Sequence, residues 1–209
     1  MIKAFLFDYD GVITAGCGDG VPAARLSKNL GVSVEQAAQW IVSIWDGYST
    51  GRLSDEAAWK DIEAKYGKPI TAAQRDIWYD WEDLTPLPEM TALVQRLRAA
   101  GYPVGVVSNV IPPTAALIRE HGGYDGFDFV LLSYKVGVRK PDAKMYEAAL
   151  AKLGGLEPEE VVYLDDREPL TSAASKLGLQ TIFVDDHAHA ISMILALVGS
   201  SVGAIGLKL

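Results

Sequence analysis

Short apolar segments recur along the chain and alternate with segments of helical periodicity. Five of them have the length and composition of buried strands: residues 2–7, 104–107, 127–132, 161–164 and 181–184. Each of the last four follows a helical pattern; before residues 104–107, Met90, Leu93, Val94 and Leu97 repeat at helical spacing. Strands that alternate with helices predict an α/β fold in which helices cover both faces of a parallel sheet. The chain has 209 residues, enough to bury a large core.

One stretch interrupts this alternation. Between residues 16 and 85 no buried-strand segment occurs, and helix starts follow one another instead. The expected starts are Pro22, Ser33 with Gln36 as a capping box, Ser54, and Thr71 with Gln74. We therefore expect an all-helical insertion over residues 16–85, carried by a core of residues 1–15 and 86–209.

All five tryptophans lie in this insertion. A small helical module needs large side chains to build a core, so we expect most of them to be buried there. Trp45 and Tyr48 are the expected exceptions, because they precede a break at residues 49–51 where a helix end can face a cleft.

The charge and cysteine content restrict the partners. A net charge of -8 without a basic run excludes a nucleic-acid backbone or an anionic membrane as partner. The single Cys17 excludes an internal disulfide and indicates a reducing compartment, and Asp8 interrupts the N-terminal apolar segment before it reaches signal-peptide length. We expect a cytoplasmic monomer or homodimer. The apolar stretch at residues 191–207 is a poor membrane span and predicts a last helix with a packed tail, or a self-association surface.

Polar residues follow the predicted strands. They are Asp8 and Asp10, Ser108 and Asn109, Ser133, Asp165 and Asp166, and Asp185 and Asp186, with Lys140 in the loop after the third strand. Because ligands of a parallel sheet bind at the carboxyl ends of its strands, these residues are candidates for one site. Carboxylates gathered there would repel each other without a hard cation between them, and oxygen ligands favour Mg²⁺.

A divalent ion beside a hydroxyl and a lysine suits phosphoryl transfer, in which charge spreads over three phosphoryl oxygens. Asp8 would be the nucleophile that forms an aspartyl-phosphate. Asp10 would protonate the leaving oxygen and later activate water.

These residues form four ordered motifs that resemble those of the haloacid dehalogenase (HAD) superfamily. The motifs are Asp8-Tyr9-Asp10-Gly11-Val12-Ile13, Val107-Ser108-Asn109, Ser133 with Gly137-Val138-Arg139-Lys140-Pro141-Asp142, and Leu164-Asp165-Asp166. The resemblance spans nearly the whole chain and implies a Rossmann-like core. The insertion after the first motif resembles the α-helical cap of one HAD subclass, which includes phosphatases and phosphomutases of small metabolites.

The resemblance also implies roles for single residues. Asp8 would bind Mg²⁺ as well as attack phosphorus, and Asp10 would add its main-chain carbonyl to the metal. Ser108, Asn109 and Lys140 would bind the phosphoryl group. Asp166 would be the more direct metal ligand of its pair, with Asp165 acting through water or orienting Lys140. Many relatives carry Asn a few residues after this motif, where this chain has Leu170.

Other polar residues are interpreted as structural. We place Asp185 and Asp186 about two strand spacings, roughly 10 Å, from Asp8 and outside the metal site. His187 and His189 are two residues apart and would point to different sides of a helix, so we expect both to be solvated. Cys17 is expected to be a small hinge residue. The glycines around it lack the spacing of a dinucleotide-binding loop.

The predicted function is Mg²⁺-dependent hydrolysis of a small phosphate monoester. A phosphomutase would use the same core residues, a 2-haloacid dehalogenase would need neither Mg²⁺ nor Asp10, and a scaffold protein would be inactive. The substrate stays open among phosphoglycolate, sugar phosphates and nucleoside monophosphates.

Overall fold

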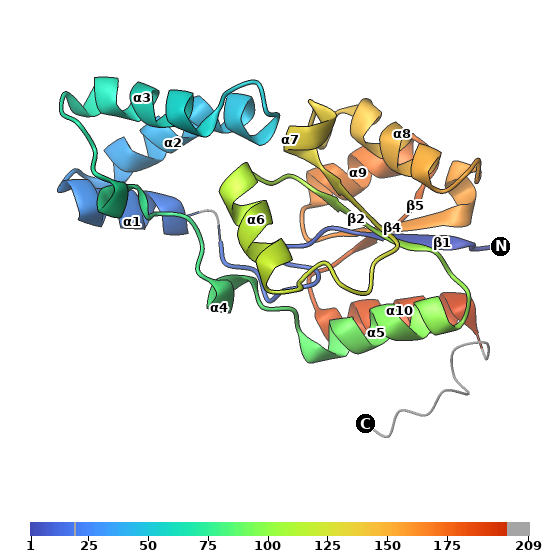
Figure 1. The fold of residues 1–209 in the computed structure, drawn as a ribbon. Helices are drawn as coiled ribbons and strands as arrows, with labels where there is room; N and C mark the ends of the chain where they lie inside the picture. The colour runs from blue at the N-terminus through green and yellow to red at the C-terminus, as the bar shows by residue number, and fades with distance from the viewer. Residues whose placement is uncertain (19, 200–209) are drawn as a thin grey trace.

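The computed structural model describes residues 1–18 and 20–199, and its centre is a five-stranded parallel sheet in the order β3-β2-β1-β4-β5 (Figure 1). The strands are β1 (Ala4–Phe7), β2 (Val104–Ser108), β3 (Phe129–Leu132), β4 (Val161–Asp165) and β5 (Gln180–Phe183). All four strand pairs are parallel; Phe7 pairs with Val106 on one side and Leu164 on the other. The predicted α/β sheet is confirmed, with strand boundaries shifted by one or two residues.

Helices cover both faces of the sheet. The core helices are α5 (Pro88–Ala99), α6 (Pro112–Glu120), α7 (Ser133–Val136), α8 (Ala143–Lys152), η2 (Pro158–Glu160), α9 (Glu168–Lys176) and α10 (His187–Val198). Figure 1 shows α8 and α9 on one face and α5 and α10 on the other. Side chains alternate along β1: Phe5 and Phe7 pack in the cluster that includes α5 and α10, and Ala4 and Leu6 in the cluster with α8 and α9.

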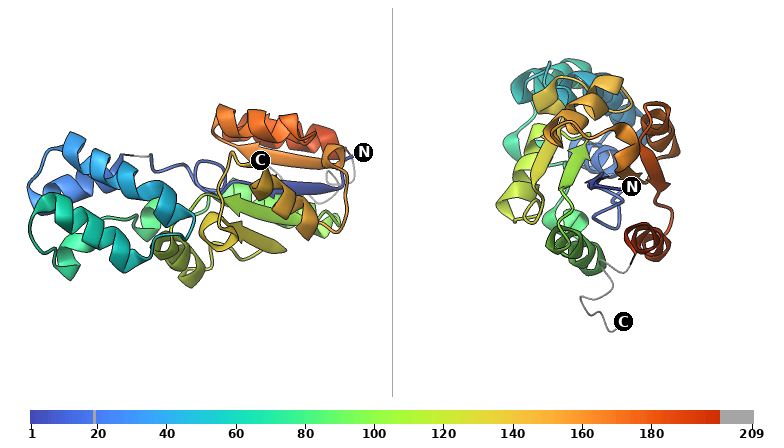
Figure 2. Two further views of the ribbon diagram at one scale, coloured as in Figure 1. Left: turned by 90° about the horizontal axis from the view of Figure 1, so that it is seen from above. Right: turned by 90° about the vertical axis from the view of Figure 1, so that its right-hand side faces the viewer.

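The segment between β1 and α5 is helical and forms a separate lobe (Figure 2). It contains α1 (Val21–Leu30), α2 (Val34–Ser49), α3 (Asp55–Tyr66), η1 (Ala72–Arg75) and α4 (Trp81–Leu84). The predicted capping box forms at Ser33, where the hydroxyl accepts from the Gln36 N–H at 3.2 Å. Thr71 starts only a 3-10 turn, because η1 has no buried side chain that could anchor a longer helix.

A second hydrophobic cluster fills this lobe. Ala37, Ile41, Ile44 and Tyr48 form the buried stripe of α2 and pack against Trp59. Trp40, Trp45 and Trp78 pack at the margin of this cluster. Among the five tryptophans only Trp59 is fully buried, and the other four are half-buried. Trp81 lies outside this cluster: it packs on the hydrophobic cluster of the sheet and stacks on the ring of His121, with centroids 4.7 Å apart.

The C-terminal end of α2 lies against the core at α7. The hydroxyl of Ser133 donates to the carbonyl of Ser49 at 2.6 Å and accepts from the N–H of Val110 at 3.0 Å. Gly51 has a φ of +70°, and a Cβ at this position would lie 2.3 Å from the carbonyl oxygen of Tyr134. The backbones of the helical lobe and the core therefore meet here at a distance that leaves no room for a side chain.

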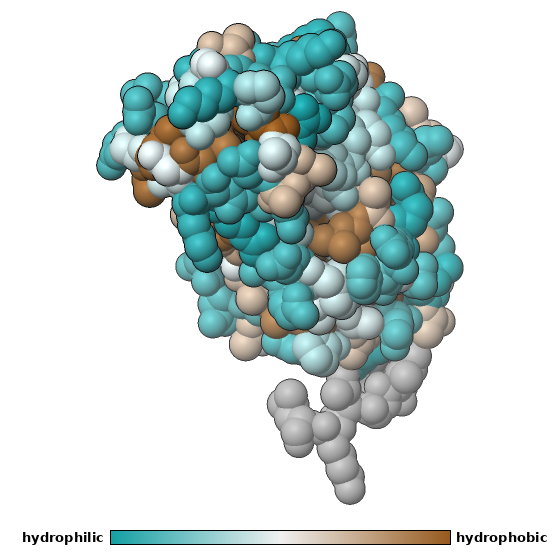
Figure 3. All heavy atoms as spheres, turned by 60° about the vertical axis from the view of Figure 1, so that its left-hand side comes forward, coloured by the Kyte–Doolittle hydropathy of each residue, from teal (hydrophilic) through white to brown (hydrophobic). Residues whose placement is uncertain are grey.

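The surface seen in Figure 3 is largely hydrophilic, with hydrophobic residues gathered in small patches. Within the described part of the chain, no helix has the length and apolar character needed to cross a bilayer. α10 packs on the main core through Ala190, Ile194 and Val198. The predicted tail beyond it, residues 200–207, lies outside the described residues.

Candidate active site

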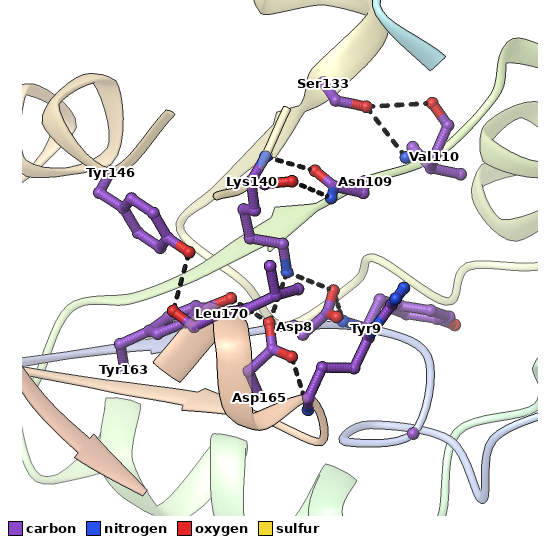
Figure 4. A network of polar contacts seen from close by, with 12 residues as sticks. Asp8, Tyr9, Asn109, Val110, Ser133, Lys140, Tyr146, Tyr163, Asp165 and Leu170 are labelled. Carbon is purple, nitrogen blue, oxygen red and sulfur yellow. Dashed lines mark hydrogen bonds and ion pairs between the residues drawn. The ribbon is translucent and has the colours of Figure 1, made fainter. Parts of the chain in front are cut away.

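The candidate residues gather at the carboxyl edge of the sheet (Figure 4). Asp8 follows β1 directly, Ser108 ends β2 and Asp165 ends β4. Since β2 and β4 flank β1, the strand order places the three side chains next to each other. Lys140 reaches the same edge from the loop between α7 and α8.

The Lys140 side chain is fully buried between two carboxylates. Its Nζ lies 3.0 Å from Oδ1 of Asp8 and 2.8 Å from Oδ2 of Asp165, and 5.5 Å from the centre of the Tyr163 ring. An ammonium group without access to water is stable only beside compensating charges. Lys140 therefore holds the carboxyl ends of β1 and β4 together electrostatically.

Asn109 fixes the main chain of Lys140. The Lys140 N–H donates to Oδ1 of Asn109 at 2.8 Å, and Nδ2 of Asn109 donates to the Lys140 carbonyl at 2.9 Å. The side-chain amide predicted to bind phosphate is thus occupied by the loop that presents the lysine. Ser108 is buried and lines the cavity described below.

Asp165 has no exposed surface, and both of its oxygens accept hydrogen bonds. Oδ2 accepts from Lys140 and from the hydroxyl of Tyr163, and Oδ1 accepts from the Arg167 N–H at 2.9 Å. Asp165 thus contacts the Lys140 ammonium directly. Tyr163 was missed from the sequence, because it appears there only as one apolar residue of a buried strand.

Asp8 is 8% exposed and accepts from the N–H of Tyr9 at 2.8 Å. Burial raises the pKa of its carboxyl from 3.8 to about 7; the ammonium of Lys140 opposes this rise, and the carboxylate of Asp165 adds to it. In the absence of a further cation, the carboxylate form of Asp8 is therefore costly to bury.

Asp8, Asp165 and Asp166 form a carboxylate cluster in which one oxygen of each lies within 4.8 Å of the others. Burial and the charges of Asp165 and Asp10 raise the pKa of Asp166. The backbone of Gly11 approaches Asp166 closely: Gly11 has a φ of +75°, and a Cβ there would lie 2.2 Å from Oδ2. Glycine at this position allows the first motif to reach the last one.

Asp10 lies outside this cluster and is held by two donors. The hydroxyl of Thr14 donates to Oδ1 at 2.9 Å, and the thiol of Cys17 donates to Oδ2 at 3.2 Å. Burial, then the charge of Asp10, raises the pKa of the Cys17 thiol to about 12, so it stays protonated. Cys17 was expected to be only a small hinge residue; the structure shows that it is also a hydrogen-bond donor to Asp10.

A cavity of about 240 Å³ opens above this edge and is lined by both lobes. Trp45 lines it, as predicted, whereas Tyr48 does not. Tyr48 continues the buried stripe of α2, and its hydroxyl donates to Asp55. Several lining residues were missed because they belong to no motif: Tyr79, Leu84, Thr114 and Ile118. Arg139, which also lines the cavity, belongs to the third motif but was given no role there.

Leu170 stands where the resemblance described above implies Asn. It is buried and lines the cavity, and its carbonyl accepts from the hydroxyl of Tyr146 at 2.9 Å. Leu170 thus contributes apolar surface to the cavity wall.

The acidic residues and histidines interpreted as structural lie in or next to α10. Asp186 caps this helix, accepting from the His189 N–H at 2.7 Å, and both residues are exposed. His187 is half-buried rather than solvated, with a buried Nε2 that has no hydrogen-bond partner among the described residues.

The raised pKa of Asp8 predicts a pH effect on stability. The native carboxyl takes up a proton as pH falls through about 7, whereas in the unfolded chain it does so only near 4. Between these values the native state binds more protons, so this group makes the metal-free protein more stable as pH falls from 7 to 4. Asp8→Asn removes the effect. The measurement is urea unfolding in the presence of a chelator. The free energy of unfolding of the wild type minus that of Asp8→Asn should increase as pH falls, by up to about 1.4 kcal/mol per pH unit. A difference that does not depend on pH contradicts the prediction.

Comparison with known proteins identifies the family of this chain. The model of the haloacid dehalogenase-like hydrolases matches residues 2–178. A glyceraldehyde 3-phosphate phosphatase from Methanopyrus kandleri is 32% identical, covering 87% of this chain and 83% of the relative. The sesquiterpene phosphatase astK from Aspergillus oryzae is 25% identical, over 94% of this chain and 97% of its own.

A solved structure shares the fold. The HAD family enzyme from Bacteroides thetaiotaomicron, in complex with magnesium and inorganic phosphate, superposes with a TM-score of 0.76 at 21% identity, over 91% of this chain and 99% of that one. The family match across residues 2–178, together with the 32% identical phosphatase, shows that the chain belongs to the haloacid dehalogenase-like hydrolases.

Proposed function

We propose that the protein is a Mg²⁺-dependent phosphatase that hydrolyses a small phosphate monoester through an aspartyl-phosphate on Asp8. The observation that carries the proposal is the buried Lys140 ammonium in contact with Asp8, within a cluster of three carboxylates of which two, Asp8 and Asp166, line the cavity. A nucleophile, a cation for the phosphoryl oxygens and ligands for a metal are thus within one site.

The carboxylate cluster fits Mg²⁺. Its donors are all oxygen atoms, which hard divalent cations prefer, and their spacing allows them to share one ion. Because both oxygens of Asp165 already accept hydrogen bonds, we assign the metal to Asp8, Asp166 and the main-chain carbonyl of Asp10. When bound, Mg²⁺ supplies positive charge to the phosphoryl oxygens and lowers the cost of the Asp8 carboxylate.

The reaction then proceeds in two displacements. Asp8 attacks phosphorus, the bond from phosphorus to the alcohol oxygen breaks, and Asp10 gives that oxygen its proton. In the second step, water loses a proton to Asp10 and attacks phosphorus, and the bond to Asp8 breaks, releasing inorganic phosphate. Lys140 and Ser108 hold the phosphoryl oxygens in both steps.

The contacts of Asp10 support its role as acid and base. Thr14 and Cys17 fix the carboxylate from two sides, outside the carboxylate cluster. A dehalogenase would have no use for an acid held in this way. The relatives named above are phosphatases of glyceraldehyde 3-phosphate and of a sesquiterpene, and the Bacteroides enzyme was solved with magnesium and phosphate.

We also propose a cytoplasmic location and a monomer or homodimer. The location rests on the single cysteine. Fractionation and light scattering test these two statements.

Substitution of the two aspartates separates their roles. With p-nitrophenyl phosphate and Mg²⁺, Asp8→Asn should abolish turnover. Asp10→Asn should keep Mg²⁺ binding, measured by calorimetry, but lose about 100-fold or more in turnover, because the second step lacks its base. Since nitrophenolate leaves without an acid, this variant should accumulate phosphate on Asp8, visible by mass spectrometry.

Asp185→Asn, at an exposed carboxylate outside the site, is the matched control and should behave as wild type. Unchanged turnover in Asp10→Asn would contradict its assignment as acid and base. Transfer of labelled phosphate to a second substrate hydroxyl instead of water would identify a phosphomutase, and metal-independent halide release from a 2-haloacid would identify a dehalogenase.

Lys140 should govern phosphate affinity. Lys140→Ala removes the buried ammonium, so the inhibition constant for inorganic phosphate should rise at least about tenfold, a loss of roughly 1.4 kcal/mol. The exposed Lys144 on α8 provides the control variant Lys144→Ala, which should leave that constant unchanged. Circular dichroism checks that both variants fold. Equal phosphate inhibition of wild type and Lys140→Ala would exclude the proposed phosphoryl site.

A further inference from the structure

The polar residues on the floor of the cavity are all accounted for by phosphoryl chemistry. Asp8, Asp10 and Asp166 serve the nucleophile, the acid and the metal, and Ser108 serves the phosphoryl group. Asn109 is bonded to the Lys140 main chain. The group that the substrate carries beyond its phosphate must therefore meet the rest of the cavity.

Much of that remainder is an apolar wall contributed by both lobes, beside which Tyr9, Tyr79, Thr114, Arg139 and Arg167 also line the cavity. We define the apolar wall as Trp45 of α2, Leu84 of α4, Val110 and Ile111 before α6, Ile118 of α6, and Leu170 of α9. Ile111 also belongs to the hydrophobic cluster of the helical lobe, so the wall is continuous across the two lobes.

Most polar side chains beside this wall already have partners. The hydroxyl of Tyr9 donates to the Leu84 carbonyl at 3.1 Å, and the side chain of Tyr79 hydrogen-bonds to Cys17. Nε of Arg139 lies 3.1 Å from Oδ1 of Asp46, and Arg167 is exposed. A sugar group placed here would lose its contacts with water and find few replacements, which is costly for each buried hydroxyl.

Thr114 is the exception. It is 5% exposed, lines the cavity, and its hydroxyl has no hydrogen-bond partner among the described residues. It lies one helical turn before Ile118, which also lines the cavity. A buried donor of this kind gains free energy when a ligand supplies an acceptor.

We propose that the substrate is the phosphate monoester of an apolar alcohol that carries one further oxygen, which accepts a hydrogen bond from Thr114. This inference rests on the proposed phosphatase function and adds the substrate class. The apolar wall encloses the hydrocarbon part, and Thr114 selects the position of the oxygen.

The wild-type enzyme tests the hydrocarbon part without any substitution. With Mg²⁺, kcat/KM is measured for ethyl, butyl and hexyl phosphate, glycerol 3-phosphate, 5-carboxypentyl phosphate and p-nitrophenyl phosphate. It should rise about threefold to fourfold for each methylene that enters the cavity, the factor expected for burial of a CH₂ group. Hexyl phosphate should exceed both glycerol 3-phosphate and the carboxylated ester.

The possible failures are distinguishable. Preference for glycerol 3-phosphate, or absence of a chain-length effect, overturns the apolar class and leaves the phosphatase intact. Preference for the carboxylated ester also overturns the apolar class and indicates that Arg139 or Arg167 binds the carboxylate of the substrate. Turnover of none of the esters, p-nitrophenyl phosphate included, overturns the phosphatase function itself.

Variants on α6 locate the wall. Ile118→Ala should lower the ratio of hexyl to ethyl phosphate kcat/KM several-fold. Leu117→Ala removes carbons from the neighbouring position of the same helix, which does not line the cavity, and should keep the ratio. An unchanged ratio in folded Ile118→Ala overturns its place in the wall.

Thr114 is tested with hexyl phosphates that carry one hydroxyl at each carbon from C2 to C6. One isomer should exceed hexyl phosphate about tenfold in kcat/KM. Thr114→Val, of similar shape, should abolish that advantage, and Thr114→Ser should retain it. If no isomer exceeds hexyl phosphate, or if Thr114→Val keeps the advantage, the role of Thr114 is refuted.

Discussion

The contact between the Lys140 ammonium and the carboxylates of Asp8 and Asp165 is the interaction on which the site depends. The Lys140 ammonium and the Asp165 carboxylate have no exposed surface and Asp8 has little, so each charge requires the others. The parallel order that puts β1 beside β4 brings the two carboxylates together. Asn109, Tyr163 and the Arg167 N–H then hold the lysine and Asp165 in place. Much of the hydrogen bonding at this edge therefore serves to keep one charge arrangement fixed.

Most of the fold could be predicted from the sequence because buried parallel strands are continuous apolar segments and their ends are polar. That rule alone located Asp8, Ser108 and Asp165. It could not identify Tyr163 as part of the site, because a tyrosine inside a buried strand fits the apolar pattern and its hydroxyl does not change that pattern. It also could not show that the Asn109 amide turns towards Lys140, since that depends on where the loop after α7 runs.

The helical lobe was harder to predict for a physical reason. Its aromatic residues are similar in character, and whether one is buried or faces the cavity depends on its helix face. Trp45 and Tyr48 are three residues apart on α2, yet Tyr48 belongs to the buried stripe and Trp45 reaches the cavity. Trp81 lies beyond the lobe's own cluster, where the chain already packs on the core. Cys17 donates a hydrogen bond to Asp10 because the fold brings the two side chains together, and the amino-acid composition gives no information on that distance.

Gly51 gives the two lobes their spacing. Since its Cα lies directly against the Tyr134 carbonyl, any side chain there would act as a wedge between α2 and α7. Trp45, six residues earlier on α2, would move with that wedge, while Asp8 and Lys140 on the core would not. The volume of the cavity and the arrangement of Asp8 and Lys140 at the sheet edge can therefore change independently. A substitution at position 51 could therefore change the size of the cavity during evolution while the residues at the carboxyl edge of the sheet stay in place.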